Sequence, residues 1–272
     1  YDEDVIKVAI IGCGKIANNA HEPAYEAARD ISEVKYFCDI LPERARALRD
    51  KYGSGEVIED YHVILSDPEV TCVSVCTPNY VHAPITIDCL KAKKHVLCEK
   101  PAAVNAELAA EMQKAADDNG MILNIGVCNR FNTAVNKVRD LIAAGELGEI
   151  YAVEAHMDIF HDTAKRQWES KFPGGMMYFL GCHLIDLVYR IQGAPMRVRA
   201  MNCATGAEGV VIINRGRMGL QMIHHGMAHR IAEGGLFTVQ DVVRQPIAFK
   251  GMAQQVFAFP INIHFPGRIN GH

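Results

Sequence analysis

The chain has 272 residues, of which 49% are hydrophobic, and this suffices for two domains because domains are typically about 100–200 residues long. The formal net charge of -4 argues against a nucleic-acid partner, since such proteins usually carry a clustered basic face. With no apolar run of about 18–20 residues, no basic leader and nine cysteines dispersed as single residues, the sequence predicts a soluble, cytoplasmic protein with reduced thiols and no membrane partner.

Short β-branched runs alternate with Ala-rich helical segments through the first 127 residues, which is typical of βαβ units around a parallel sheet. The predicted strands are Val5–Ile11, Val34–Asp39, Val70–Thr77, His95–Cys98 and Met121–Val127. The predicted helices between them are Ile16–Ala28, Pro42–Tyr52, Val81–Ala92 and Asn105–Asn119. The pattern therefore predicts an α/β fold, a doubly wound Rossmann sheet over residues 1–127.

A second region, residues 128–272, begins with a predicted helix at Phe131–Ala144, a turn at Gly145–Gly148 and a β-rich segment at Glu149–Asp158. The sequence near the C-terminal end of this region is unusual in composition. Residues 201–272 contain three acidic side chains against six Lys or Arg, with glycines that interrupt any regular period. From about residue 204 we therefore expect an atypical part of this domain, truncated or altered in sequence.

The turn after the first predicted strand has the G-x-G-x-x-A pattern of a dinucleotide site. It contains Gly12, Cys13, Gly14, Lys15, Ile16 and Ala17. The glycines allow a tight turn and close approach to a pyrophosphate, which the helix N-terminus attracts. Asp39 ends the second predicted strand, where a carboxylate accepts hydrogen bonds from the adenosine ribose and repels the 2′-phosphate of NADP. Because two charges about 4 Å apart interact by roughly 1–4 kcal/mol, the sequence predicts NAD as the cofactor.

Further motifs follow in a fixed order. They are Thr77-Pro78-Asn79 with His82, Glu99-Lys100-Pro101, Gly126 to Phe131, Ala144 to Gly148, Gly174-Gly175, and Gly181 to Asp186. Together with the glycine turn, they resemble the Gfo/Idh/MocA oxidoreductases from Ile6 to about Pro195. The resemblance implies that an α+β domain with a mainly antiparallel sheet follows the Rossmann domain, supplying the substrate site and the interface of a homo-oligomer, a dimer or tetramer.

The matched polar positions are the candidate site. Ligands of open α/β sheets lie beyond the carboxyl ends of the strands, where Thr77, Asn79 and Lys100 are expected to face the nicotinamide. The cofactor-binding candidates at these motifs are Thr77, Pro78, Asn79, His82, Glu99, Lys100, Asn129 and Arg130. The resemblance further implies that Lys100 contacts cofactor and substrate and that His183 takes part in proton transfer. Asp186 is a third catalytic candidate, orienting the imidazole or else pairing locally.

These residues predict an NAD(P)-dependent dehydrogenase or reductase acting on a secondary alcohol of a sugar, a polyol or a related small molecule, with Lys100 and His183 handling the proton. One departure leaves alternatives open, because Phe179 stands where relatives commonly have an Asp four residues before the histidine. The alternatives are an NAD-dependent glycosidase or lyase with no net redox change and a non-catalytic cofactor-binding homologue. His225 and His229 lie four residues apart, but Gly226 between them disfavours a helix, so no metal site is expected.

Overall fold

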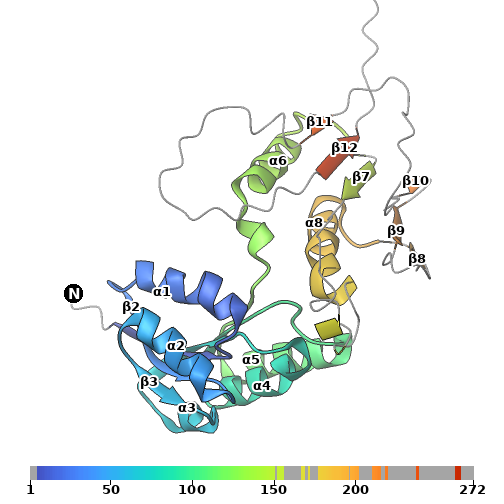
Figure 1. Ribbon diagram of the computed structural model, residues 1–272. Helices are drawn as coiled ribbons and strands as arrows, with labels where there is room; N and C mark the ends of the chain where they lie inside the picture. Colours follow the sequence, from blue (N-terminus) through green and yellow to red (C-terminus); the bar gives the residue numbers. More distant parts are fainter. Residues whose placement is uncertain are drawn as a thin grey trace, which may run out of the picture. The chain divides into compact units, whose positions relative to one another are not determined.

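The computed structural model describes residues 5–150, 152–155, 167–168, 171, 177–195, 197–201, 210–215, 218–219, 237–238 and 261–264. The chain divides into two compact units (Figure 1). The described residues up to Gly126, with Trp168 and Lys171, belong to the first unit, and the remaining ones from Val127 onward belong to the second.

The first unit is built on a six-stranded sheet in which every neighbouring pair is parallel. Its strands are β1 (Ile6–Ile11), β2 (Ser32–Cys38), β3 (Glu56–Ile58), β4 (Val70–Val75), β5 (His95–Cys98) and β6 (Leu123–Ile125). Their spatial order is β3-β2-β1-β4-β5-β6. The order reverses between β1 and β4, as in doubly wound dinucleotide-binding sheets, so the predicted Rossmann sheet is confirmed.

Helices follow the strands in the expected alternation. They are η1 (Ala17–His21), α1 (Glu22–Ala27), α2 (Pro42–Tyr52), α3 (His62–Ser66), η2 (Asn79–Val81), α4 (His82–Lys91) and α5 (Ala106–Asn119). Local chemistry sets their ends. The Asn105 side chain accepts a hydrogen bond from Leu108 N at 2.8 Å to start α5, and Gly120 ends it in the left-handed conformation.

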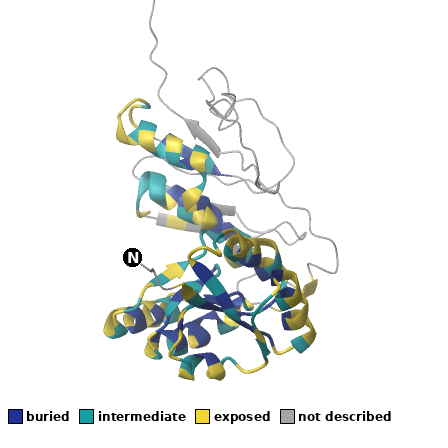
Figure 2. Cartoon of the chain, turned by 90° about the vertical axis from the view of Figure 1, so that its left-hand side faces the viewer, coloured by how far each residue is buried: buried dark blue, intermediate teal, exposed yellow. Residues whose placement is uncertain are grey.

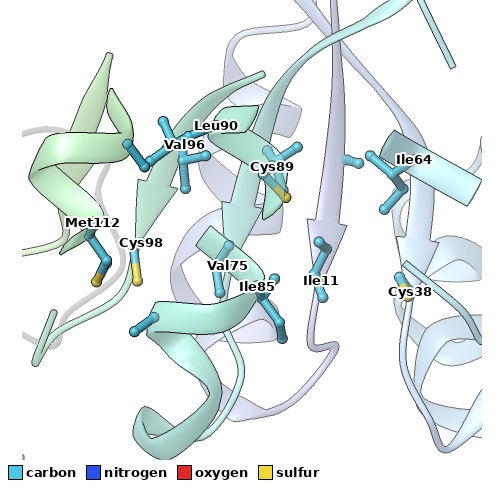
Figure 3. Packing of buried hydrophobic residues seen from close by; sticks show 14 of the residues in the cluster. Ile11, Cys38, Ile64, Val75, Ile85, Cys89, Leu90, Val96, Cys98 and Met112 are labelled. Carbon is cyan, nitrogen blue, oxygen red and sulfur yellow. The ribbon is translucent and has the colours of Figure 1, made fainter. Parts of the chain in front are cut away.

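Each face of this sheet buries its own apolar cluster. On one face, side chains of β1, β4 and β5 pack against α3, α4 and α5, and Figure 3 shows Ile11, Val75 and Cys98 in this packing with Ile85 and Leu90. On the other face, a second cluster packs side chains of β1 and β2 against η1 and α2. Buried residues accordingly concentrate on the strands, whereas exposed residues follow the outer sides of the helices (Figure 2). This core fixes the positions at which the strands end.

Three details differ from the predicted elements. The predicted helix Ile16–Ala28 is a π-helical turn, η1, followed by the short α1. Strand β3 and helix α3 were not predicted, because three and five residues are too short to show a period. The predicted strand Met121–Val127 is reduced to β6.

The second unit contains helices and short antiparallel sheets. Its helical elements are η3 (Cys128–Phe131), α6 (Thr133–Ala143), η4 (Met177–Gly181) and α8 (Cys182–Gln192). Its strands are β7 (Ala152–Ala155), β8 (Arg197–Met201), β9 (Val210–Arg215), β10 (Met218–Gly219), β11 (Phe237–Thr238) and β12 (Ile261–His264). They pair antiparallel in the orders β10-β9-β8 and β11-β12-β7, which confirms the predicted α+β domain with a mainly antiparallel sheet.

A small core holds α6, β7 and α8 together through Val135, Val153 and Leu187. Of the predicted β-rich segment Glu149–Asp158, the structure describes β7 as its strand. Gly174, Gly175, His225 and His229, for which the sequence analysis made predictions, lie outside the described residues, as does most of the chain after residue 204.

Candidate nucleotide site and catalytic residues

The glycine turn between β1 and η1 leaves no room for a side chain at its first position. Gly12 has a φ of +91°, and a Cβ there would lie 2.7 Å from the carbonyl carbon of Cys76 and 2.8 Å from Thr77 N. A Cβ at Gly14 would meet no atom of the described chain within 4 Å. The first glycine is therefore required by the fold, whereas the second borders open space in which a ligand can approach the backbone.

Asp39 ties this turn to the end of β2. Its Oδ2 accepts a hydrogen bond from Cys13 N at 2.8 Å, its Oδ1 accepts one from Leu41 N at 2.9 Å, and the residue is only 8% exposed. A carboxylate has about four lone-pair sites, so two backbone donors leave acceptor capacity for ribose hydroxyls. Lys15 and Ile16, predicted as further contacts, follow the turn on its exposed side.

Polar groups without a partner gather after β4. Among the described residues, the buried Thr77 Oγ1 and both amide atoms of Asn79 make no hydrogen bond. Each buried unsatisfied polar group costs about 1–3 kcal/mol, so a chain retains such groups where a ligand satisfies them. With the open space at Gly14, this arrangement fits a dinucleotide. Pro78 is the exposed residue between them.

Glu99 and Lys100 follow β5 at the same edge of the sheet, where Lys100 is half-buried. Glu99 Oε1 lies 2.9 Å from His21 Nε2, and its Oε2 accepts a hydrogen bond from Lys100 N at 3.2 Å. Burial by itself raises the pKa of Glu99, but the hydrogen bond and charge of His21 together with the Lys100 amide outweigh it and hold the pKa below its ordinary value. The carboxylate is therefore ionised at neutral pH.

His82, the first residue of α4, is 1% exposed. Its Nδ1 lies 2.8 Å from the carbonyl oxygen of Pro101, and its Nε2 lies 2.8 Å from that of Thr77. Burial lowers the pKa of His82, against the opposing effect of these two carbonyls. Both ring nitrogens are thus directed at backbone carbonyls, and the cofactor contact of His82 stays a prediction.

In the second unit, Arg130 of η3 binds Asp186 of α8. Arg130 Nε lies 3.0 and 3.1 Å from the two carboxylate oxygens, and Nη2 donates to the same group. The carboxylate of Asp186 thus pairs locally with Arg130, which is one of the two roles considered for it. The same contact occupies two of the Arg130 donors that were predicted to meet the cofactor.

The remaining candidates of the second unit lie near the start of α8. His183 is 7% exposed, and Phe179 is half-buried in η4. Asn129 is buried beside Arg130, and its amide nitrogen has no hydrogen-bond partner among the described residues. Lys100 belongs to the first unit and His183 to the second.

Two residues at this edge of the first unit were not predicted from the sequence, His21 and Ser74, whose side chains lie 3.2 Å apart. His21 and Glu99 are 78 positions apart, so only the fold reveals their contact.

Within the described part of the chain, no three His, Cys, Asp or Glu side chains gather as a metal site. None of the described helices is long and apolar enough to span a bilayer.

Two family models match the chain. Residues 6–127 match the oxidoreductase family with an NAD-binding Rossmann fold, and residues 135–216 match the GFO/IDH/MocA C-terminal domain. The chain belongs to the Gfo/Idh/MocA oxidoreductase family. The first unit is accordingly the family's NAD-binding Rossmann domain, which confirms the predicted family and nucleotide-binding fold.

Two relatives of the chain are named as dehydrogenases of a glucoside and of an inositol. It is 33% identical over 202 residues to D-glucoside 3-dehydrogenase of Escherichia coli, covering 72% of this chain and 56% of that protein. It is 29% identical over 199 residues to scyllo-inositol 2-dehydrogenase (NADP(+)) IolW of Bacillus subtilis, covering 72% and 54%. The chain thus spans about half the length of the curated relatives it matches.

A solved structure extends the likeness to three dimensions. The WlbA dehydrogenase of Bordetella pertussis, determined in complex with NADH and UDP-GlcNAcA, superposes with a TM-score of 0.73 at 26% identity. The match covers 80% of this chain and 65% of that chain. The likeness therefore includes the nucleotide-binding half and part of the second unit.

Proposed function

We propose that the protein is an NAD-dependent dehydrogenase or reductase acting on a CH–OH group of a sugar, a polyol or a related small molecule. The observation that carries this proposal is the group of polar atoms at the carboxyl edge of the sheet. Thr77 Oγ1 and the Asn79 amide are buried without partners, and Lys100 follows the neighbouring strand. Such an edge suits a ligand that has hydrogen-bonding groups beside a reacting carbon.

Asp39 supports a preference for NAD over NADP. Its carboxylate is fixed by two backbone donors and cannot swing away from a 2′-phosphate without losing them. Repulsion of about 1–4 kcal/mol corresponds to roughly tenfold to a thousandfold in affinity. IolW is named for NADP(+), so the proposal gives the present chain a cofactor different from the one in that relative's name.

Bound NAD supplies the hydride acceptor or donor. Lys100 is proposed to bind the substrate hydroxyl and to take or return its proton, with His183 as the second proton-handling group. Phe179 offers no carboxylate, and Asp186 is held by Arg130, so neither supplies a third proton carrier. The proposal thus assigns the proton chiefly to Lys100.

A binding and turnover experiment tests the function. NAD is titrated into the full chain by calorimetry, and a panel of polyols, sugars and glycosides is then incubated with protein and NAD. NADH accumulation with a polyol or sugar supports the dehydrogenase, and cleavage of a glycoside without net NADH supports the glycosidase or lyase alternative. Binding without turnover of any compound supports the non-catalytic homologue, which Phe179 favours, and absence of NAD binding contradicts all three.

We further propose a cytoplasmic homo-oligomer, a dimer or tetramer. Burial raises the pKa of Cys38 and Cys89 to about 12, which suits inert thiols in a reducing compartment, and no disulfide joins the cysteines in the described ranges. Light scattering on the purified full chain tests the oligomeric state, and a monomeric mass contradicts it.

A further inference from the structure

We propose that two buried histidines, His21 and His82, form a clamp that positions Lys100 by holding the residues on either side of it. The histidine clamp consists of His21 with Glu99, and of His82 with Thr77 and Pro101. The inference rests on the proposed function, because it takes Lys100 as the group that handles the substrate proton. His21 and His82 are positioning residues, since neither is required to touch substrate or cofactor.

The first half of the clamp holds Glu99. His21 is the last residue of η1, which follows the glycine turn, and its Nε2 lies 2.9 Å from Glu99 Oε1. An ionised carboxylate only accepts hydrogen bonds, so His21 donates through Nε2. The other ring nitrogen of His21, Nδ1, lies 3.2 Å from Ser74 Oγ, whose hydroxyl can donate or accept. Tyr25 OH lies 2.7 Å from Ser74 Oγ, which completes a chain with a donor at every step.

The second half holds Pro101. His82 Nδ1 lies 2.8 Å from the carbonyl oxygen of Pro101 and Nε2 lies 2.8 Å from that of Thr77, so the ring lies between the segments that follow β4 and β5. A neutral imidazole has one N–H, so it donates a hydrogen bond to one of these carbonyls and packs against the other. The charged groups with which the ring interacts are Glu99 and Lys100. Since His82 is 1% exposed, water does not replace either contact at low cost when the ring is removed.

Between the two anchors, the Lys100 backbone has little freedom. Its N–H donates to Glu99 Oε2 at 3.2 Å, so the anchored carboxylate also holds the Lys100 peptide directly. Gly126 borders the same carboxylate, and a Cβ there would lie 3.0 Å from Glu99 Oε1. A displacement of about 1 Å at a reacting group costs on the order of a hundredfold in rate, so this rigidity has a catalytic consequence.

Matched variants test the clamp in the full-length chain. His21→Phe and His82→Phe keep a ring but remove the hydrogen bonds, whereas His21→Gln and His82→Gln retain donors of the right kind. A Gln at position 21 can donate to Glu99 and accept from Ser74, and an N–H of a Gln at position 82 can replace the single hydrogen bond that the neutral His82 ring donates to a backbone carbonyl. Tyr52→Phe is the control, because it removes a buried hydrogen bond to Val34 N of β2 that involves no residue of the clamp.

We expect the two Phe variants to lower kcat at least about tenfold while the KM for NAD changes less than about threefold. The Gln variants should recover kcat to within about threefold of the parent chain, and Tyr52→Phe should leave it unchanged. In parallel, hydrogen exchange of the Lys100 amide should quicken at least about tenfold in the Phe variants while the amides of β2 keep their protection.

The outcomes separate the clamp from the proposed function. If Lys100→Met is inactive but both Phe variants retain full kcat, the clamp is overturned and the function of Lys100 stands. If Lys100→Met retains full turnover, the proposed role of Lys100 is contradicted. If no substrate is found, kcat cannot be measured for any variant. Amide exchange then decides the clamp: faster exchange at Lys100 supports it, and unchanged exchange contradicts it.

Discussion

The polar groups at the two candidate parts of the site are held in different ways. In the first unit, Asp39 and His82 are buried and bonded to the backbone, and the largely buried Glu99 is bonded to the buried His21. In the second unit, the corresponding feature is the Arg130–Asp186 pair, in which the arginine side chain is 47% exposed. The nucleotide-binding edge is therefore held by buried contacts of the fold, whereas the Arg130–Asp186 ion pair is exposed to solvent on its arginine side.

The largest expected effect is at Gly12, where the fold leaves no space. Gly12→Ala should lower the free energy of unfolding by about 3 kcal/mol, because its Cβ would meet the backbone of Cys76 and Thr77 and its φ is positive. Urea unfolding of the variant measures this loss. Gly14→Ala is the matched control: it should change stability by less than about 1 kcal/mol but weaken NAD binding, and an equal loss at both glycines contradicts this distinction.

Asp39 should show the next largest effect. Asp39→Ala leaves the Cys13 and Leu41 amides without their acceptor and should cost about 2 kcal/mol of unfolding free energy. The preference for NADH over NADPH should narrow at the same time, because the charge that repels the 2′-phosphate is gone. Fluorescence titration with both dinucleotides checks this, and an unchanged preference removes Asp39 from cofactor discrimination.

Asp67 tests whether a fixed polar group far from the site makes the free energy of unfolding depend on pH. A hydrogen bond from Lys35, with further ones from Glu69 N and Tyr36, lowers the pKa of Asp67 to about 2 from 3.8. A lowered pKa adds stability above the unfolded value, and this stability is lost as the pH falls from about 4 toward 2. Asp67→Asn should therefore cost about 1.5 kcal/mol at pH 7 and almost nothing near pH 2.

Urea unfolding across this pH range measures the effect, with Asp118→Asn as control because its ion pair with Lys114 is exposed. A loss of stability at Asp67→Asn that persists unchanged at pH 2 would point to packing rather than charge.

The smallest effect is expected in the second unit. A double-mutant cycle with Arg130→Met and Asp186→Asn should give a coupling energy of about 0.5–1 kcal/mol, since Arg130 is half-exposed and solvent screens the pair. The coupling should fall when salt is raised to about 1 M. A coupling energy above about 2 kcal/mol that does not depend on salt would contradict this expectation, because it would mean that the pair is as strong as a buried contact of the first unit.

The sequence predicted most of the Rossmann unit because its strands are continuous apolar runs between glycines and prolines. His95–Cys98 and Pro42–Tyr52 have the predicted bounds, with Pro42 at the first turn. Strand β3 was not predicted, because three residues at a sheet edge are too few to show a periodic pattern.

The contacts of the site were harder to predict than its residues. The motifs marked Glu99, His82 and Asp186, but their partners depend on which segments the fold brings together. Asp186 lies 56 positions from Arg130, and His82 reaches 19 positions along the chain to Pro101. Neither contact leaves a local pattern in the sequence. The sequence therefore predicted a cofactor contact for His82 and two alternative roles for Asp186, without naming the partner of either residue.

The central claim, that the edge of the first unit is a preformed NAD site, is tested most directly by calorimetric titration of the full-length protein with NADH and NADPH under identical salt and pH. We expect NADH to bind at least about tenfold more tightly than NADPH, because the fixed Asp39 carboxylate repels the 2′-phosphate. Equal affinities, tighter binding of NADPH, or no binding of either dinucleotide would contradict it.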